Sequence, residues 1–172
     1  MVRSASKVTA SSIEVVIAVL IALTWAVHSA VGFANPNYGD PVTLLDWLSV
    51  LSFSAGLAAL APGGWLITEL SAGARFVGTA ATVLGIGGIV AAFGNFVEDG
   101  LGLKAWGDVF ASGLLGVLAA LIALVVILLF SRRFALATLA AATFAGLMLS
   151  AEAGGFLILA AWLAVAAGLR RG

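Results

Sequence analysis

Residues 108–130, DVFASGLLGVLAALIALVVILLF, decide the class of fold. After Asp108 this stretch contains no charged side chain. About 20 consecutive apolar residues are enough for an α-helix to cross the hydrocarbon core of a bilayer. A helix of this length and composition would leave too much apolar surface on a water-soluble domain, so we expect residues 108–130 to span a membrane.

The rest of the chain has the same character. Of its 172 residues, 63% are hydrophobic and only 9% are charged, whereas soluble domains carry about 25% charged residues. We therefore expect an all-α, polytopic integral membrane bundle in which residues 1–172 form a single transmembrane domain. The chain has no cysteine and one histidine, which excludes disulfides, thiol chemistry and metal sites built from cysteines or several histidines.

Turn-forming and charged residues divide the chain into about six spans, and a T-x-x-D capping box at Thr43 starts the second. Pro62, Gly63 and Gly64 are expected to end or kink that helix, and residues 65–75 to form a short interfacial segment with Trp65 near the headgroups. The predicted spans are 13–33, 42–60, 76–96, 108–130, 134–150 and 156–169. The last two are at or below spanning length, so one of them could be re-entrant.

The basic residues predict the orientation of the bundle. If the first run is a retained helix and not a cleaved signal peptide, six crossings from a cytoplasmic N-terminus leave only Lys104 outside. The basic residues then predicted inside are Arg3, Lys7, Arg75, Arg132, Arg133, Arg170 and Arg171. Because Lys and Arg in short loops resist translocation, we expect both termini to be cytoplasmic. A five-helix arrangement would place Arg170 and Arg171 outside.

Acidic residues gather on the opposite, outer side. They are Asp40, Asp46, Glu98, Asp99, Asp108 and Glu152. Neighbouring carboxylates can share a proton or a cation, so an outer vestibule is a candidate binding site. Its residues would be His28, Asp46, Asn95, Glu98, Asp99 and Asp108.

Each of these residues also has a structural interpretation. Asp46 and Asp108 would favour the N-termini of their helices, and Lys104 would pair with an acid in its loop. His28 would be a neutral side chain bonded to a neighbouring hydroxyl or carboxylate. The sequence does not show whether the acids converge, so both interpretations stay open.

Small residues recur on one face of the helix predicted at 76–96. They are Gly78, Ala81, Gly85, Gly88 and Ala92, followed by Asn95 and Asp99. A spacing of three and four residues places them on one face, and small residues let helix backbones approach closely in lipid. A similar row follows Asp108 in the next helix: Ser112, Gly116, Ala119 and Ala123. Because a short loop joins the two helices, we expect the two rows to pack against each other.

No motif in the chain indicates catalysis. There is no H-E-x-x-H, G-x-S-x-G or P-loop sequence, and sparse basic residues give no reason to expect nucleic-acid binding. We expect a non-enzymatic bundle without metal or cofactor, which contacts the lipid bilayer and self-associates or joins other membrane subunits. The alternatives are a small proton, cation or solute transporter and a lipid-active enzyme. The composition resembles that of the Ala-, Gly- and Leu-rich polytopic membrane proteins of bacteria, which implies a bacterial inner membrane.

Overall fold

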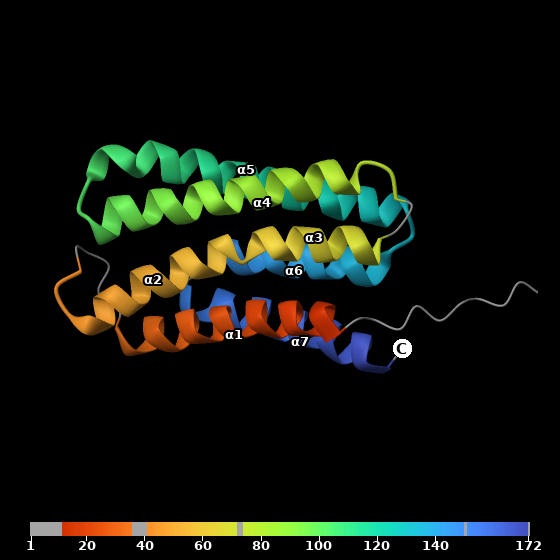
Figure 1. Cartoon of the computed structure of the whole chain (residues 1–172), viewed down its shortest axis with the longest axis horizontal. Helices are drawn as coiled ribbons and strands as arrows, with labels where there is room; N and C mark the ends of the chain where they lie inside the picture. The colour runs from red at the N-terminus through yellow and green to blue at the C-terminus, as the bar shows by residue number, and fades with distance from the viewer. Residues whose placement is uncertain (1–11, 36–40, 72–73, 150, 172) are drawn as a thin grey trace, which may run out of the picture.

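The computed structural model describes residues 12–35, 41–71, 74–149 and 151–171, which form an all-helical bundle (Figure 1). The α-helices are α1 (Ser12–Ala34), α2 (Leu44–Ala58), α3 (Leu60–Leu70), α4 (Val77–Asn95), α5 (Gly107–Phe130), α6 (Phe134–Met148) and α7 (Ala151–Arg171). A π-helical turn, η1 (Phe96–Gly100), and a 3-10 turn, η2 (Lys104–Trp106), connect α4 to α5. The described residues contain no strand, so the predicted all-α class is confirmed.

Five stretches of the described chain are long and apolar enough to cross a membrane: Ser12–Ala34, Leu44–Leu70, Val77–Gly100, Lys104–Phe130 and Ala153–Arg170. The sixth apolar helix, α6, has only 15 residues. At 1.5 Å per residue its length is about 22 Å, which is less than the hydrocarbon core thickness of about 30 Å. The chain therefore has the helices of a multi-pass membrane protein, one of them short.

α2 and α3 together make one crossing. Only Ala59 separates them, and its φ of −65° and ψ of −14° keep the chain helical. Pro62 lies in the first turn of α3, a position that tolerates proline, so it does not end the crossing. The predicted interfacial segment is wrong for residues 65–70, because α3 lies within the bundle and buries Leu66 and Ile67.

α7 begins earlier than the sequence indicated. The last predicted span starts at residue 156, but α7 starts at Ala151 and includes Gly154 and Gly155. A Cβ on Gly154 would overlap the carbonyl of Gly146 in α6, and one on Gly155 would meet Ser29 of α1. These glycines are therefore contact points between helices and not a turn.

The crossings form a closed ring. α1 packs against α2, α2 and α3 against α4, α4 against α5, α5 against α6 and α6 against α7, which returns to α1. The interior is filled by aliphatic side chains together with Trp25 and Trp162, which are 2% and 1% exposed. Large apolar side chains also cover the outside, for example Ile13 and Phe130. An apolar exterior around an apolar core is the distribution that a lipid environment permits.

The two ends of the bundle carry opposite charge. The start of α1 and the end of α7 lie at one end, together with the turn between α5 and α6 (Figure 1). We call it the basic end, because Arg75, Arg132, Arg133 and Arg170 lie there alongside Glu14 and Glu69. The acidic end holds Asp46, Glu98, Asp99, Asp108 and Lys104. The side of the membrane on which each end lies stays a prediction.

α4 uses two different small-residue faces. Ala81, Gly85, Gly88 and Ala92 are buried against α2 and α3: a Cβ on Gly88 would lie 2.5 Å from the carbonyl oxygen of Leu57. Gly78, at the start of this row, is exposed.

The face of α4 that meets α5 is another one. It consists of Gly87, Ala91 and Gly94, and Gly113 of α5 packs directly on it. The expectation that the row of Gly85 and Gly88 meets α5 is wrong. Residues 87, 91 and 94 have the same spacing as the predicted row, so either face permits close approach.

The turn between α5 and α6 places a non-glycine residue in the left-handed region. Arg132 has a φ of +57°. Its N–H donates to the carbonyl of Leu129 at 3.0 Å, and the N–H of Arg133 donates to that of Leu128 at 2.8 Å. This is a Schellman arrangement, in which glycine is the favoured residue at the left-handed position.

Arg132→Gly is therefore expected to raise the free energy of unfolding by about 1 kcal/mol, since a left-handed L-residue costs about 1–2 kcal/mol. Arg133→Gly is the matched control, because the φ of Arg133 is −97° and no such strain is present there. Unfolding by SDS titration in mixed micelles measures both. Equal stability changes in the two variants would contradict the strain argument.

Candidate functional site

Asp46 forms the best-bonded polar cluster at the acidic end. Its carboxylate accepts hydrogen bonds from the N–H of Thr43 at 2.7 Å, the hydroxyl of Thr43 at 2.8 Å and the N–H of Val42 at 3.1 Å. The Thr43 hydroxyl oxygen accepts from the N–H of Asp46 at 3.2 Å, which completes the predicted capping box. The buried amide of Asn35, just after α1, also donates to this carboxylate at 2.5 Å. In this arrangement Asp46 stabilises the N-terminus of α2 and links α2 to α1.

His28 is buried between α1 and α2. Its Nδ1 lies 3.3 Å from the hydroxyl oxygen of Ser52. The imidazole centroid lies 5.0 Å from that of Phe53, and Trp25 meets it edge-on at 5.8 Å. The side chain is 4% exposed, so it lies inside the bundle and not in an open vestibule.

Asn95 makes the corresponding contact between α4 and α2. Its amide Nδ2 donates to the hydroxyl of Ser54 at 3.0 Å, and the side chain is buried. Ser52 and Ser54 thus hold His28 and Asn95 from opposite sides of α2. Sequence reasoning missed both serines; the available indication was the presence of hydroxyls in an otherwise apolar span.

The remaining acids lie around the connection from α4 to α5. Asp99 forms an ion pair with Lys104 across 3.5 Å, and both side chains are well exposed, so the pair contributes about 0–1 kcal/mol. The Glu98 carboxylate lies over Gly107, where an added Cβ would come within 2.8 Å of its Oε1. Asp108 is exposed in the first turn of α5.

These residues lie toward the same end of the bundle, and whether they form one binding site stays a prediction. In the part of the chain that the structure describes, no three His, Cys, Asp or Glu side chains come close enough to hold a metal ion. Asp40 and the side chain of Glu152 lie outside the described residues. The contacts of Asp46, His28 and Asn95 instead connect α2 to α1 and α4.

The small-residue row of α5 lies largely on the outer surface of this helix. Ser112 and Ala119 are exposed and Gly116 is half-buried, although this row was expected to pack against α4. Beside the row, a shallow groove of about 250 Å³ runs between α4 and α5, lined mainly by Ile86, Val90 and three glycines. The expectation was wrong for Ser112 and Ala119, because α5 turns Gly113 and Val117 toward α4 instead. Gly116 lies at the edge of that contact, where an added Cβ would be 3.8 Å from the Cα of Gly87. We call Ser112, Gly116, Ala119 and this groove the outer α5 face.

The fold and the distribution of polar groups define a class: a multi-pass, all-helical membrane protein whose described spans carry their charges near the ends. Comparison with known proteins found no matching family model, no matching curated protein and no matching solved structure.

Proposed function

We propose that the protein is a non-enzymatic membrane scaffold that self-associates through the outer α5 face. The observation that carries the proposal is the exposure of Ser112 and Ala119 on α5, with the half-buried Gly116 between them. Lipid tails are as apolar as the side chains, so burying an apolar side chain between membrane helices contributes little free energy. Helix association in lipid instead depends on close packing of backbones at small residues. Ser112 and Gly116 stand four residues apart, the spacing at which two helices approach closely.

The surroundings of this row suit a second copy of the chain. Leu115 and Ile122 flank it and are 66% and 52% exposed. In a symmetric dimer both subunits use the same patch. Leu115 and Ile122 of one subunit would therefore pack into the small-residue row and groove of the other. Knob-into-hole packing of this kind is how parallel and antiparallel helices fit together.

The polar contacts inside the bundle support a scaffold more than transport. His28, Asn95 and Asp46 each bond to a residue of a neighbouring segment, and each contact fixes a helix position. The charges at the two ends agree with placement in a bacterial inner membrane with the basic end in the cytoplasm. That orientation is part of the proposal.

The test is the dimer dissociation constant of Gly116→Leu/Ala119→Leu, measured by energy transfer in liposomes. We expect the dissociation constant of this variant to be at least about tenfold higher than that of wild type, equivalent to about 1.4 kcal/mol. Leucine at these positions would keep the helix backbones of the two subunits apart. Ala141→Leu/Ala160→Leu is the control, since both alanines are exposed on α6 and α7.

Crosslinking provides a second readout. The chain has no native cysteine, so Ser112→Cys introduces a single thiol on the outer α5 face. Oxidation is expected to give a covalent dimer, and Ala160→Cys is expected to give none. A strictly monomeric wild-type protein, or leucine variants that dimerise as well as wild type, would overturn the proposal.

A further inference from the structure

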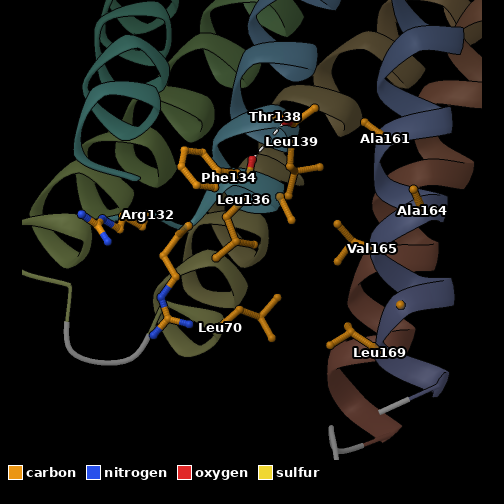
Figure 2. A pocket seen from close by; sticks show the side chains of 13 residues that line it. Leu70, Arg132, Phe134, Leu136, Thr138, Leu139, Ala161, Ala164, Val165 and Leu169 are labelled. Atoms are coloured by element: carbon orange, nitrogen blue, oxygen red, sulfur yellow. Dashed lines mark hydrogen bonds between the residues drawn. The ribbon is translucent and has the colours of Figure 1, made fainter. Parts of the chain in front are cut away.

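An apolar groove opens at the basic end between the start of α6 and the end of α7. Its volume is about 760 Å³, within the range of about 300–1,000 Å³ that is usual for sites of small ligands. Leu136 and Leu139 of α6 lie across from Val165 and Leu169 of α7, and Leu70 of α3 lies at one end (Figure 2). This groove is remote in the fold from the outer α5 face.

The sequence of α7 explains why the groove stays open. The wall that α7 contributes includes Ala161, Ala164 and Gly168, whose side chains are too short to reach α6. A Cβ added at Gly168 would meet no atom within 4 Å. The bundle therefore leaves space between α6 and α7 at this end that a long apolar ligand can fill.

The mouth of the groove is cationic. Arg132 and Arg133 belong to its lining, and among the described residues that line it none is acidic. Figure 2 shows Arg132 at the rim, on the side of α6 away from α7. The first turn of α6 begins at the same place and has no side-chain cap, so its backbone N–H groups add positive potential.

We propose that this groove binds an anionic phospholipid, with an acyl chain between α6 and α7 and the phosphate beside Arg132 and Arg133. The apolar walls suit an acyl chain, and the arginines suit a phosphate. A free phosphate would leave the apolar walls uncovered, and a lipid without net charge would give the arginines less to bind. Basic pockets between membrane helices are a recognised mode of binding anionic headgroups.

Native mass spectrometry of the delipidated protein in detergent tests the proposal, with dioleoyl phosphatidylglycerol and dioleoyl phosphatidylcholine as probes. The two lipids have identical acyl chains, so their difference in affinity measures the headgroup. We expect wild type to bind phosphatidylglycerol at least about tenfold more tightly, a difference of about 1.4 kcal/mol. Arg132→Gly/Arg133→Ala is expected to bring the two affinities within about twofold, and glycine suits the backbone at position 132.

Two further variants separate the groove from general charge effects. Ala164→Phe fills the apolar wall and leaves both arginines in place, so binding of both lipids should weaken. Arg75→Ala removes an exposed basic residue of the same end that does not line the groove, and the preference for phosphatidylglycerol should persist.

Equal affinity of wild type for the two lipids would overturn the proposal, and so would a preference that survives loss of both arginines. Phosphatidylglycerol binding unaffected by Ala164→Phe would show that the acyl chain lies elsewhere. Full competition by glycerol phosphate would indicate a site for soluble anions in place of a lipid. None of these outcomes depends on whether the protein dimerises, so the two proposals fail separately.

Discussion

Replacing Gly113 by alanine is expected to lower the free energy of unfolding by about 3 kcal/mol, the upper part of the usual range for overpacking. The added Cβ would overlap the backbone nitrogen of Ala91 and lie 2.8 Å from its Cα and 2.9 Å from the carbonyl oxygen of Gly87. These atoms belong to the middle of α4 and cannot rotate away as a side chain can. The two helices would have to separate along their contact.

The same reasoning applies to Gly94 on the other side of the contact. A Cβ there would overlap the backbone nitrogen of Phe110 and lie 2.6 Å from its Cα. Gly94→Ala is therefore expected to resemble Gly113→Ala in its effect. Because the two positions belong to one contact, the double variant should lose less than the sum of the two single losses.

Gly78→Ala is the matched control for these substitutions. Gly78 also lies in α4, but a Cβ there would be 4.0 Å from the nearest neighbour, Cγ2 of Thr68. The change should leave the free energy of unfolding constant or raise it by up to about 1 kcal/mol through helix propensity. SDS titration of the three variants, with refolding to establish reversibility, gives the comparison. A Gly113→Ala protein as stable as Gly78→Ala would mean that α4 and α5 do not approach as closely as the structure shows.

The apolar helical stretches were predictable from sequence, whereas the choice of helix partners was not. Apolar runs and charged boundaries set the spans, because a helix that ended within the lipid would leave backbone polar groups without hydrogen-bond partners. Partner choice depends on which small face meets which helix, and α4 has two such faces with one spacing. Only three-dimensional packing separates Gly85 and Gly88, which meet α2 and α3, from Gly87 and Gly94, which meet α5.

The two helix junctions that were missed have local physical reasons. Pro62 indicates a helix end in the sequence, but it lies in the first turn of α3, which tolerates proline, and Ala59 keeps the chain helical. Gly154 and Gly155 read as a turn, but close approach to Gly146 and Ser29 gives glycine another use. In both places the deciding atoms belong to a distant part of the chain or to the backbone.

In the candidate site, too, local contacts were predictable from the sequence and long-range contacts were not. The capping box of Thr43 and Asp46 spans four residues, so the sequence could predict it, and it is confirmed. The partners of His28 and Asn95 are Ser52 and Ser54, which lie 24 and 41 residues away in the chain. A single sequence offers no means of pairing such residues across helices.

Asp46→Ala is expected to lower the free energy of unfolding by about 2 kcal/mol. About 1 kcal/mol comes from the lost capping interactions at Thr43 and the start of α2. A similar amount follows because the amide of Asn35, which is 8% exposed, would lose the carboxylate to which it donates. Loss of both should let the start of α2 and the end of α1 separate, since the Asn35 contact joins them.

Asp108→Ala separates this effect from a general loss of negative charge at the acidic end. Asp108 and Asp46 both lie in the first turn of their helices, but Asp108 is exposed, so its removal should cost about 0.3–1 kcal/mol through the helix dipole alone. Asp46→Asn keeps one carbonyl oxygen as an acceptor and should fall between the two. Hydrogen exchange of the amides at the start of α2 localises the effect, which should be concentrated there in Asp46→Ala and absent in Asp108→Ala. Equal losses in the two alanine variants would show that charge, and not the hydrogen-bonded link between α1 and α2, is what Asp46 contributes.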